Sequence, residues 1–145
     1  VMYHFRDSDH TYVDKYLEKL SFLEPEVESL QKITNNPNFA GDDTVLKRLN
    51  LLTGTGNQLQ FSEGNVVVYP QFQESTLTLI HPVEVNAFDI QQILALVEGQ
   101  NIGIFSSKPN RPQLIVLDFS LDKKNTSGKS EVYDLNIRIL KREYL

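Results

Sequence analysis

The segment that most constrains the fold is a stretch near the C-terminal end in which apolar and polar side chains alternate. In the segment from Glu131 to Lys141, the side chains from Tyr133 to Ile139 alternate between apolar and polar or charged. Such alternation is typical of a β-strand that is buried on one face only. A strand needs neighbours, so the sequence predicts a sheet with one solvated face and one face covered by helices. The residues assigned to the buried face are Tyr133, Leu135, Ile137 and Ile139.

Other segments supply the neighbours and the cover. Alternation and turn residues predict strands at residues 59–61, 66–69, 76–80 and 114–121. A helix is expected between the capping residue Asp42 and Gly54, and a second between Asn86 and Gly99. This order predicts an α+β fold of the ferredoxin-like sandwich type, an antiparallel sheet with helices on one face. In the strand at 114–121, the residues expected to share one face are Ile115, Leu117, Phe119 and Leu121. In the second helix, Asp89 suits a capping box, and the apolar stripe comprises Ile90, Ile93, Leu94 and Val97.

The N-terminal region carries a heptad-like spacing of apolar residues. From Asp9 to Ile33 they recur at intervals of three and four, as in the seam of a coiled coil. Pro25 interrupts this pattern, because a proline inside a helix removes a hydrogen bond and clashes with the preceding turn. Either the helix kinks near Phe22, or a second helix starts with Pro25 in its first turn. The seam residues, which are the candidate interface residues, are Val13, Tyr16, Leu20, Leu23, Val27 and Leu30.

Two interpretations of this seam stay open at this point. It forms a coiled-coil-like stalk that packs on a partner, or an amphipathic helix that packs on its own domain. The turn-forming run from Asn35 to Asn38, followed by Gly41, is a plausible linker. The predicted organisation is a helical stalk and linker at residues 1–40, followed by a ferredoxin-like α+β domain at residues 41–145.

Composition excludes several classes of function. Of the 145 residues, 40% are hydrophobic and 23% are charged, as in a globular domain. The absence of cysteine excludes disulfides, thiol nucleophiles and cysteine-based zinc sites. The net charge of −5 argues against nucleic-acid binding. No apolar run reaches the roughly 18 residues of a membrane span. Because the sequence opens with Val1 and Met2, we expect a fragment that lacks an N-terminal signal or anchor.

No segment carries a catalytic motif. The Gly54–Gly56 run follows a helix and lacks the third glycine of a dinucleotide fingerprint, so it is interpreted as a helix end and turn. The three histidines, His4, His10 and His81, lack the spacing of a metal site. The sequence therefore predicts a protein that is not an enzyme and has no cofactor and no metal. The remaining charged candidates, interpreted as solvated side chains, are Asp118, Asp122, Lys123, Lys124 and Lys129.

Four stretches of the chain resemble the soluble domain of PilO-type proteins of type IV pili and of GspM-type proteins of type II secretion. Residues 46–61 (LKRLNLLTGTGNQLQF) resemble the helix, glycine and first strand of that domain. Residues 76–97 (TLTLIHPVEVNAFDIQQILALV) resemble its next strand, short turn and following helix. Residues 113–121 (QLIVLDFSL) and 133–145 (YDLNIRILKREYL) resemble its third and closing strands. The resemblance covers roughly residues 9–145 and lies in element order and hydrophobic spacing.

The resemblance implies a scaffold rather than a catalyst. It implies an assembly protein of the inner-membrane alignment subcomplex of a pilus or secretion machine. Such a protein forms homodimers, and heterodimers with a PilN- or GspL-like protein of similar fold. It also implies an extracytoplasmic, periplasmic domain of a single-pass inner-membrane protein, with no nucleic acid and no small-molecule substrate as partner. The alternative is a small-molecule-binding regulatory α+β module, because this architecture hosts many functions.

Overall fold

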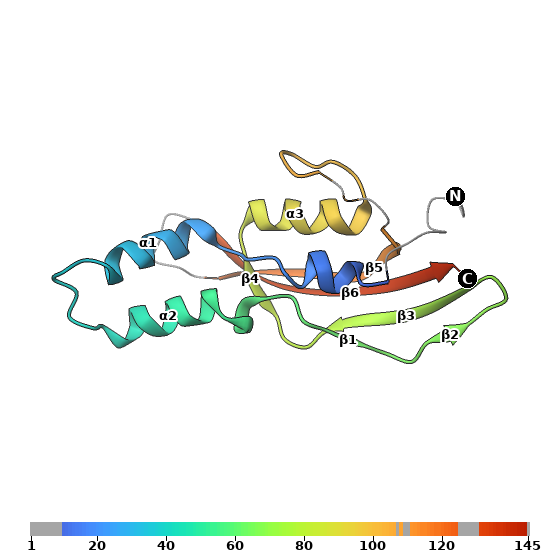
Figure 1. Cartoon of the computed structure of the whole chain (residues 1–145), viewed down its shortest axis with the longest axis horizontal. Coiled ribbons are helices and arrows are strands. Elements are labelled where there is room, and N and C mark those ends of the chain that lie inside the picture. Colours follow the sequence, from blue (N-terminus) through green and yellow to red (C-terminus); the bar gives the residue numbers. More distant parts are fainter. Residues whose placement is uncertain (1–9, 107, 109–110, 125–130, 145) are drawn as a thin grey trace.

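The chain folds into an α+β arrangement of one antiparallel sheet and several helices (Figure 1). The computed structural model describes residues 10–106, 108, 111–124 and 131–144. No helix in this part of the chain combines the length and apolar character needed to cross a membrane. The helical elements are η2 (Val13–Leu17), α1 (Glu24–Thr34), α2 (Asp43–Thr53), η3 (Thr55–Asn57) and α3 (Ala87–Glu98). The strands are β1 (Phe61–Glu63), β2 (Val67–Val68), β3 (Phe72–Leu79), β4 (Val83–Val85), β5 (Gln113–Lys124) and β6 (Val132–Tyr144).

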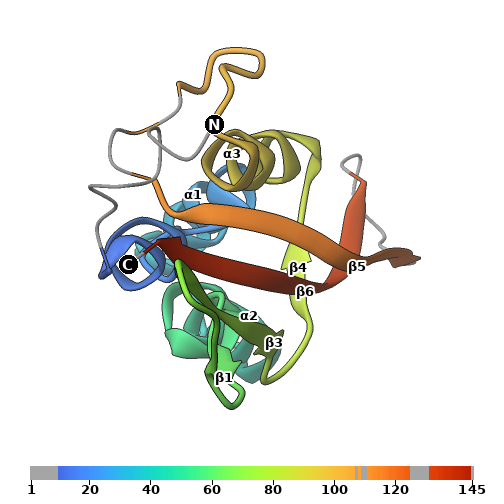
Figure 2. The same cartoon turned by 90° about the vertical axis from the view of Figure 1, so that its right-hand side faces the viewer.

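Strand β6 is the centre of the six-stranded sheet. Along one side, β5 pairs with nearly its whole length, from Gln113 opposite Arg142 to Lys124 opposite Val132. The other side of β6 is shared by β3 and, further along, by the short β4. Because β1 and β2 pair with β3, β5 is the strand at the opposite edge of the sheet (Figure 2).

A helical crossover connects the two flanks of β6. The chain leaves β3 and β4, passes through α3 and returns as β5 on the other side of β6. Both β3 and β5 are antiparallel to β6, so they are parallel to each other. Strand, helix and strand with another strand between them form a split β-α-β unit. The predicted α+β class with an antiparallel sheet is confirmed.

The core lies on the face of β6 that its alternation predicts. Leu135, Ile137 and Ile139 are 0%, 1% and 0% exposed, and Tyr133 is half-buried. Their cross-strand neighbours include Leu77 of β3, which is opposite Ile139 and is also buried. Buried residues of α3 belong to the same cluster, so this helix covers the core face as expected.

Helix α3 begins and ends where its capping residues predict. The Asn86 side chain accepts a hydrogen bond from the Asp89 N–H (2.9 Å), and Asp89 accepts one from the Asn86 N–H (2.9 Å). This reciprocal pair is a capping box. At the other end, Gly99 adopts a left-handed conformation with φ of 69°, which a residue without a side chain adopts at little cost.

The N-terminal region differs from the single helix that the heptad spacing predicts. It consists of η2 and α1 with an irregular segment between them, and Leu23 has a left-handed backbone with φ of 57°. Helix α1 starts at Glu24, so Pro25 lies in its first turn, the second of the two alternatives. The break has a tertiary cause. Phe22 and Leu23 are buried in the core, and the Leu23 N–H donates to Oδ2 of Asp89 (3.0 Å).

The six seam residues are therefore divided between η2, α1 and the segment that joins them, and they form no continuous seam. Val13 and Leu23 are buried in the core of their own chain. The remaining four are partly buried and pack against that core: Tyr16, Leu20, Val27 and Leu30. The boundary proposed at residue 40 falls in the turn between α1 and α2, which pack against each other (Figure 1).

Strand β5 contains an irregularity that alternation did not predict. Its register against β6 shifts between Val116 and Asp118, so Leu117 is the extra residue of a β-bulge. Ile115 lies opposite Leu140, whereas Phe119 lies opposite Ile137, which points to the other face of the sheet. The prediction that Ile115 shares a face with Leu117, Phe119 and Leu121 is therefore wrong. Three other strands also differ from their predicted limits. Strand β1 starts two residues later than predicted, β2 is shorter, and β3 is longer.

Candidate functional site

The outer edge of β5 is the candidate interaction surface. Within the described part of the chain, β5 pairs with β6 and with no other strand. Alternate N–H and C=O groups of an edge strand point away from the sheet and have no strand partner there. Such an edge can accept a strand from another chain, with main-chain hydrogen bonds supplying affinity and side chains supplying specificity.

Three large apolar side chains lie along this edge. Leu117, Phe119 and Leu121 are 43%, 41% and 36% exposed. Phe119 and Leu121 lie opposite the fully buried Ile137 and Leu135, so they are on the core side of the sheet. They remain partly in solvent because β5 has a neighbouring strand on one side only. A contiguous exposed apolar stripe of this kind is typical of a protein-interaction surface.

Ion pairs neutralise charge on either side of Phe119. The Asp118 carboxylate pairs across the strands with the Arg138 guanidinium (2.6 Å), and Lys123 pairs with Glu131 (3.2 Å). A hydrogen bond from the Tyr133 hydroxyl, together with the nearby Lys123 ammonium, lowers the pKa of Glu131. An incoming apolar strand therefore meets little uncompensated charge at the centre of the edge.

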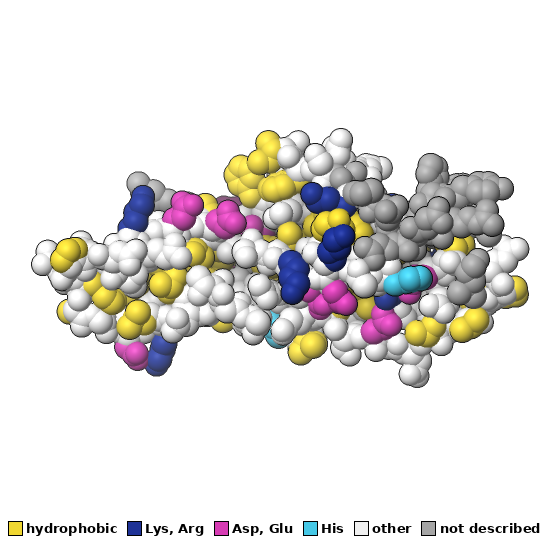
Figure 3. Space-filling view, in the orientation of Figure 1, with side chains coloured by type: hydrophobic (Ala, Val, Ile, Leu, Met, Phe, Trp, Pro, Cys, Tyr) yellow, Lys and Arg dark blue, Asp and Glu magenta, His cyan; other side chains and the backbone are white. Residues whose placement is uncertain are grey.

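Two hollows lie on the surface, and the first is lined partly by Asp118, Phe119 and Ser120 of β5. One, of about 390 Å³, sits on the polar face of the sheet, where the paired side chains of Asp118 and Arg138 form part of its wall. The other, of about 330 Å³, lies between η2, α3 and the loop that follows α3. In Figure 3, Lys or Arg side chains border a hydrophobic patch in the region of η2 and α3.

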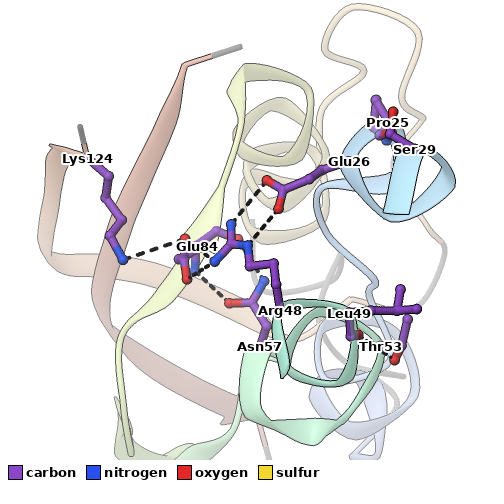
Figure 4. A network of polar contacts seen from close by, with 9 residues as sticks. All are labelled: Pro25, Glu26, Ser29, Arg48, Leu49, Thr53, Asn57, Glu84 and Lys124. Carbon is purple, nitrogen blue, oxygen red and sulfur yellow. Dashed lines mark hydrogen bonds and ion pairs between the residues drawn. The ribbon is translucent and has the colours of Figure 1, made fainter. Parts of the chain in front are cut away.

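A polar network joins the helices to the far end of the sheet (Figure 4). The Arg48 guanidinium of α2 donates to both carboxylate oxygens of Glu84 in β4 (2.9 and 2.8 Å) and to Glu26 of α1 (2.6 and 3.1 Å). Lys124, the last residue of β5, lies 3.6 Å from the Glu84 carboxylate. The Asn57 side chain exchanges two hydrogen bonds with the Glu84 backbone (2.9 and 2.7 Å). Residues of α2, η3 and β5 thus contact Glu84 of β4 directly, and Glu26 of α1 is joined to it through Arg48.

This network is structural rather than catalytic. Burial acts to raise the pKa of Glu84, but the hydrogen bonds and charges of Arg48 and Lys124 outweigh burial and lower it. The hydrogen bonds of Arg48 with Glu26, and then those with Glu84, raise the pKa of Arg48 against the opposing effect of burial. A carboxylate held ionised by two cations is a poor proton acceptor, and general-base catalysis needs a group whose pKa lies near the operating pH.

The candidate catalytic and metal-binding residues are not brought together. His10 contacts Glu143, and His81 contacts Gln60, in different parts of the molecule. No group of three His, Cys, Asp or Glu side chains that could hold a metal ion occurs among the described residues. Gly54 ends α2 and Gly56 lies in the turn η3, as the sequence predicts. Lys123 and Lys124 are strand residues rather than loop residues. His4 and Lys129 lie outside the described residues.

The sequence predicts that Leu117, Phe119 and Leu121 lie in a strand, but it does not predict that this strand is at the edge of the sheet. Leu117, Phe119 and Leu121 alternate like core residues, and nothing local distinguishes a central strand from an edge strand. The polar residues between them, Asp118 and Ser120, show only that one face of β5 is solvated, and the central strand β6 has the same pattern.

Comparisons with protein-family models, with curated proteins and with solved structures found no match for this chain.

Proposed function

We propose that this chain is a non-enzymatic assembly domain that docks a partner chain through the outer edge of β5. The observation that carries the proposal is the coincidence of an unpaired strand edge with the exposed side chains of Leu117, Phe119 and Leu121. Backbone groups that need partners and apolar surface that needs cover occur on the same strand. One added strand would pair these backbone groups and cover this apolar surface.

The resemblance to PilO-type and GspM-type proteins supplies the cellular setting of this proposal. In that setting the chain is the ferredoxin-like, periplasmic part of an inner-membrane scaffold, which pairs with itself and with a PilN- or GspL-like partner. The split β-α-β unit supports this part of the proposal, because ferredoxin-like sandwiches contain such units. A pairing surface that is built on main-chain hydrogen bonds suits both a second copy and a partner of similar fold.

Self-pairing has one register that suits the side chains. In antiparallel pairing around a twofold axis at Phe119, Phe119 lies opposite its own copy and Leu117 lies opposite Leu121. Asp118 then lies opposite Ser120. If the twofold axis instead passes through Asp118, this residue lies opposite its own copy. If it passes through Ser120, Asp118 lies opposite Asp122. Like charges directly opposite each other are unfavourable. Because Leu117 is the bulge residue, regular pairing around this axis covers residues 118–120, with Leu117 and Leu121 at its ends.

Disulfide cross-linking tests this arrangement, because the chain has no cysteine of its own. A single Phe119→Cys substitution places two thiols opposite each other across the twofold axis, within the reach of a disulfide. We expect oxidation to give covalent dimers in much higher yield than in the matched control Ile80→Cys, which is 64% exposed and lies outside β5. Equal yields from the two variants would exclude self-pairing through this edge.

The cellular setting has a separate test in the full-length protein in its own cells. Membrane fractionation followed by protease digestion of intact spheroplasts should show integral membrane association and digestion of this domain from outside. A soluble, protease-protected protein would remove the pilus or secretion setting. Cross-linking in cells then tests whether the β5 edge docks a partner of another sequence. We expect Phe119→Lys to lose assembly and Ile80→Lys to retain it.

A further inference from the structure

A groove on another side of the molecule combines positive charge with an apolar floor. It has a volume of about 330 Å³ and lies between η2, the middle of α3 and the loop after α3. Three lysines from two distant segments, Lys15, Lys19 and Lys108, line it. The apolar part of its lining consists of Tyr16, Leu20, Leu96, Ile104 and Phe105. The volume lies at the small end of the range for ligand sites in proteins.

The charge of this groove is opposite to that of the chain. The whole sequence carries a net charge of −5, yet no acidic residue lines the groove. Among the described residues, none of the three lysines forms an ion pair with a carboxylate at 4 Å or less. The acidic residues nearest in sequence, Asp14 and Glu18, do not line the groove, and the Glu18 carboxylate accepts a hydrogen bond from the backbone N–H of Phe61 (2.8 Å). Three ammonium groups around one hollow repel each other, and an anion between them would relieve that repulsion.

An aromatic ring holds two of these cations at the groove. The ammonium groups of Lys15 and Lys108 lie 5.3 and 5.9 Å from the centroid of the Tyr16 ring. Cation–π attraction at such distances favours these positions of the flexible lysine side chains. The Tyr16 ring is supported from behind by the buried Tyr12, 5.0 Å away, whose hydroxyl donates to the Leu96 carbonyl (2.8 Å). The floor is thus fixed to α3.

The apolar rim is exposed to an unusual degree. Ile104 is 80% exposed, at the tip of a tight loop in which Ile102 and Phe105 exchange two backbone hydrogen bonds (2.9 Å each). This loop presents Ile104 and Phe105 beside the lysines rather than turning them into the core. In Figure 3, the dark blue side chains near η2 and α3 surround yellow ones, so charge and apolar surface meet on this face.

We infer that this groove binds an amphipathic anion, a single carboxylate or phosphate group carried on an acyl or aromatic body. The lysines would pair with the acidic head, and Leu20, Ile104 and Phe105 would cover the apolar body. Nucleic acid fits less well, because its binding needs a longer track of phosphate contacts than three lysines provide. A soluble acid and an acidic membrane lipid share the required chemistry, and the experiment below distinguishes them. The inference does not depend on docking at β5.

The test compares two triple variants with the same change in charge. Lys15→Gln/Lys19→Gln/Lys108→Gln removes the groove cations, and Lys32→Gln/Lys47→Gln/Lys123→Gln removes three lysines placed elsewhere. All six are surface residues, so both variants should fold; circular dichroism verifies this. With decanoate as the probe in isothermal titration calorimetry, we expect the groove variant to bind about tenfold or more weakly, and the control less than about twofold. Decanol has no charge, so its affinity should be the same for both variants and for the parent chain.

Two further measurements identify the source and complete the test. Sedimentation compares binding to phosphatidylglycerol vesicles with binding to phosphatidylcholine vesicles. Binding to phosphatidylglycerol vesicles that is lost in the groove variant alone assigns a membrane lipid. Decanoate binding without vesicle binding assigns a soluble acid. Ile104→Asn should weaken decanoate binding with the lysines intact, since the apolar body loses its cover. Equal losses in the two triple variants, or no decanoate binding by the parent chain, would overturn the inference.

Discussion

Strands β5 and β6 form one hairpin and carry nearly the same apolar alternation, yet their side chains have opposite environments. Leu135 of β6 is 0% exposed, and Leu121, directly opposite it on β5, is 36% exposed. Both leucines point to the core side of the sheet. They differ because, among the described residues, β6 has strands on both sides and β5 has a strand on one side. Alternation therefore reports which face a side chain occupies, and the position of its strand in the sheet decides whether that face is covered.

The largest expected effect comes from truncating this matched pair. Leu135→Ala should lower the free energy of unfolding by about 2–5 kcal/mol, because it leaves a cavity in a packed core. Leu121→Ala should lower it by about 1 kcal/mol or less, since its side chain already contacts water. Urea unfolding followed by circular dichroism measures both. Similar costs in the two variants would show that the edge is as well packed as the centre.

The next largest effect concerns the cover of the core by the N-terminal segment. Asp89→Ala removes the acceptor for the backbone N–H groups of Leu23 and Asn86, one of them buried. We expect a loss of about 2–3 kcal/mol, because each orphaned donor keeps its desolvation cost. Asp43→Ala, in the exposed first turn of α2, is the matched control and should cost well under 1 kcal/mol. Native-state hydrogen exchange should show faster exchange of the Leu23 amide in the first variant only.

A smaller effect, with a defined pH dependence, comes from the network at the far end of the hairpin. Arg48→Met leaves Glu84 with the more distant Lys124 as its cation, and we expect a loss of about 1–3 kcal/mol at pH 7. The pKa of Glu84 is lowered in the folded state, so its contribution is present above the ordinary carboxylate range. It is lost as the pH falls through the folded-state value. The cost of Arg48→Met should therefore be smaller at pH 3 than at pH 7, with Lys32→Met, a lysine that has no ion pair among the described residues, as the control.

The smallest effect on stability is expected at the centre of the exposed edge. Phe119→Lys should lower the free energy of unfolding by no more than about 1 kcal/mol, because 41% of its side chain is already exposed. The same substitution should abolish association through β5, whereas Ile80→Lys should leave association intact. Sedimentation equilibrium and urea unfolding on both variants separate the two effects. A large loss of stability in Phe119→Lys would place this residue in the core rather than at an interface.

Local sequence determined the elements whose signals lie within a few residues. The limits of α3 follow from Asn86, Asp89 and Gly99, because capping depends on hydrogen bonds between neighbours in the chain. The buried face of β6 follows from its strict alternation. Pro25 left two alternatives, a kinked helix or a new helix, and the start of α1 at Glu24 agrees with the second.

Tertiary structure alone decided the rest, because it depends on contacts between segments far apart in the chain. The heptad spacing from Val13 to Leu30 could not reveal that an Asp89 side chain, 66 residues away from Leu23, would hold the break in place. The groove likewise brings Lys15 and Lys19 beside Lys108, and no spacing in the sequence relates them. The exposed edge of β5 follows from strand order, which alternation does not encode. The sequence determined the buried face of β6 and the ends of α3, and the assembled sheet determined the bulge in β5 and which side chains stayed in solvent.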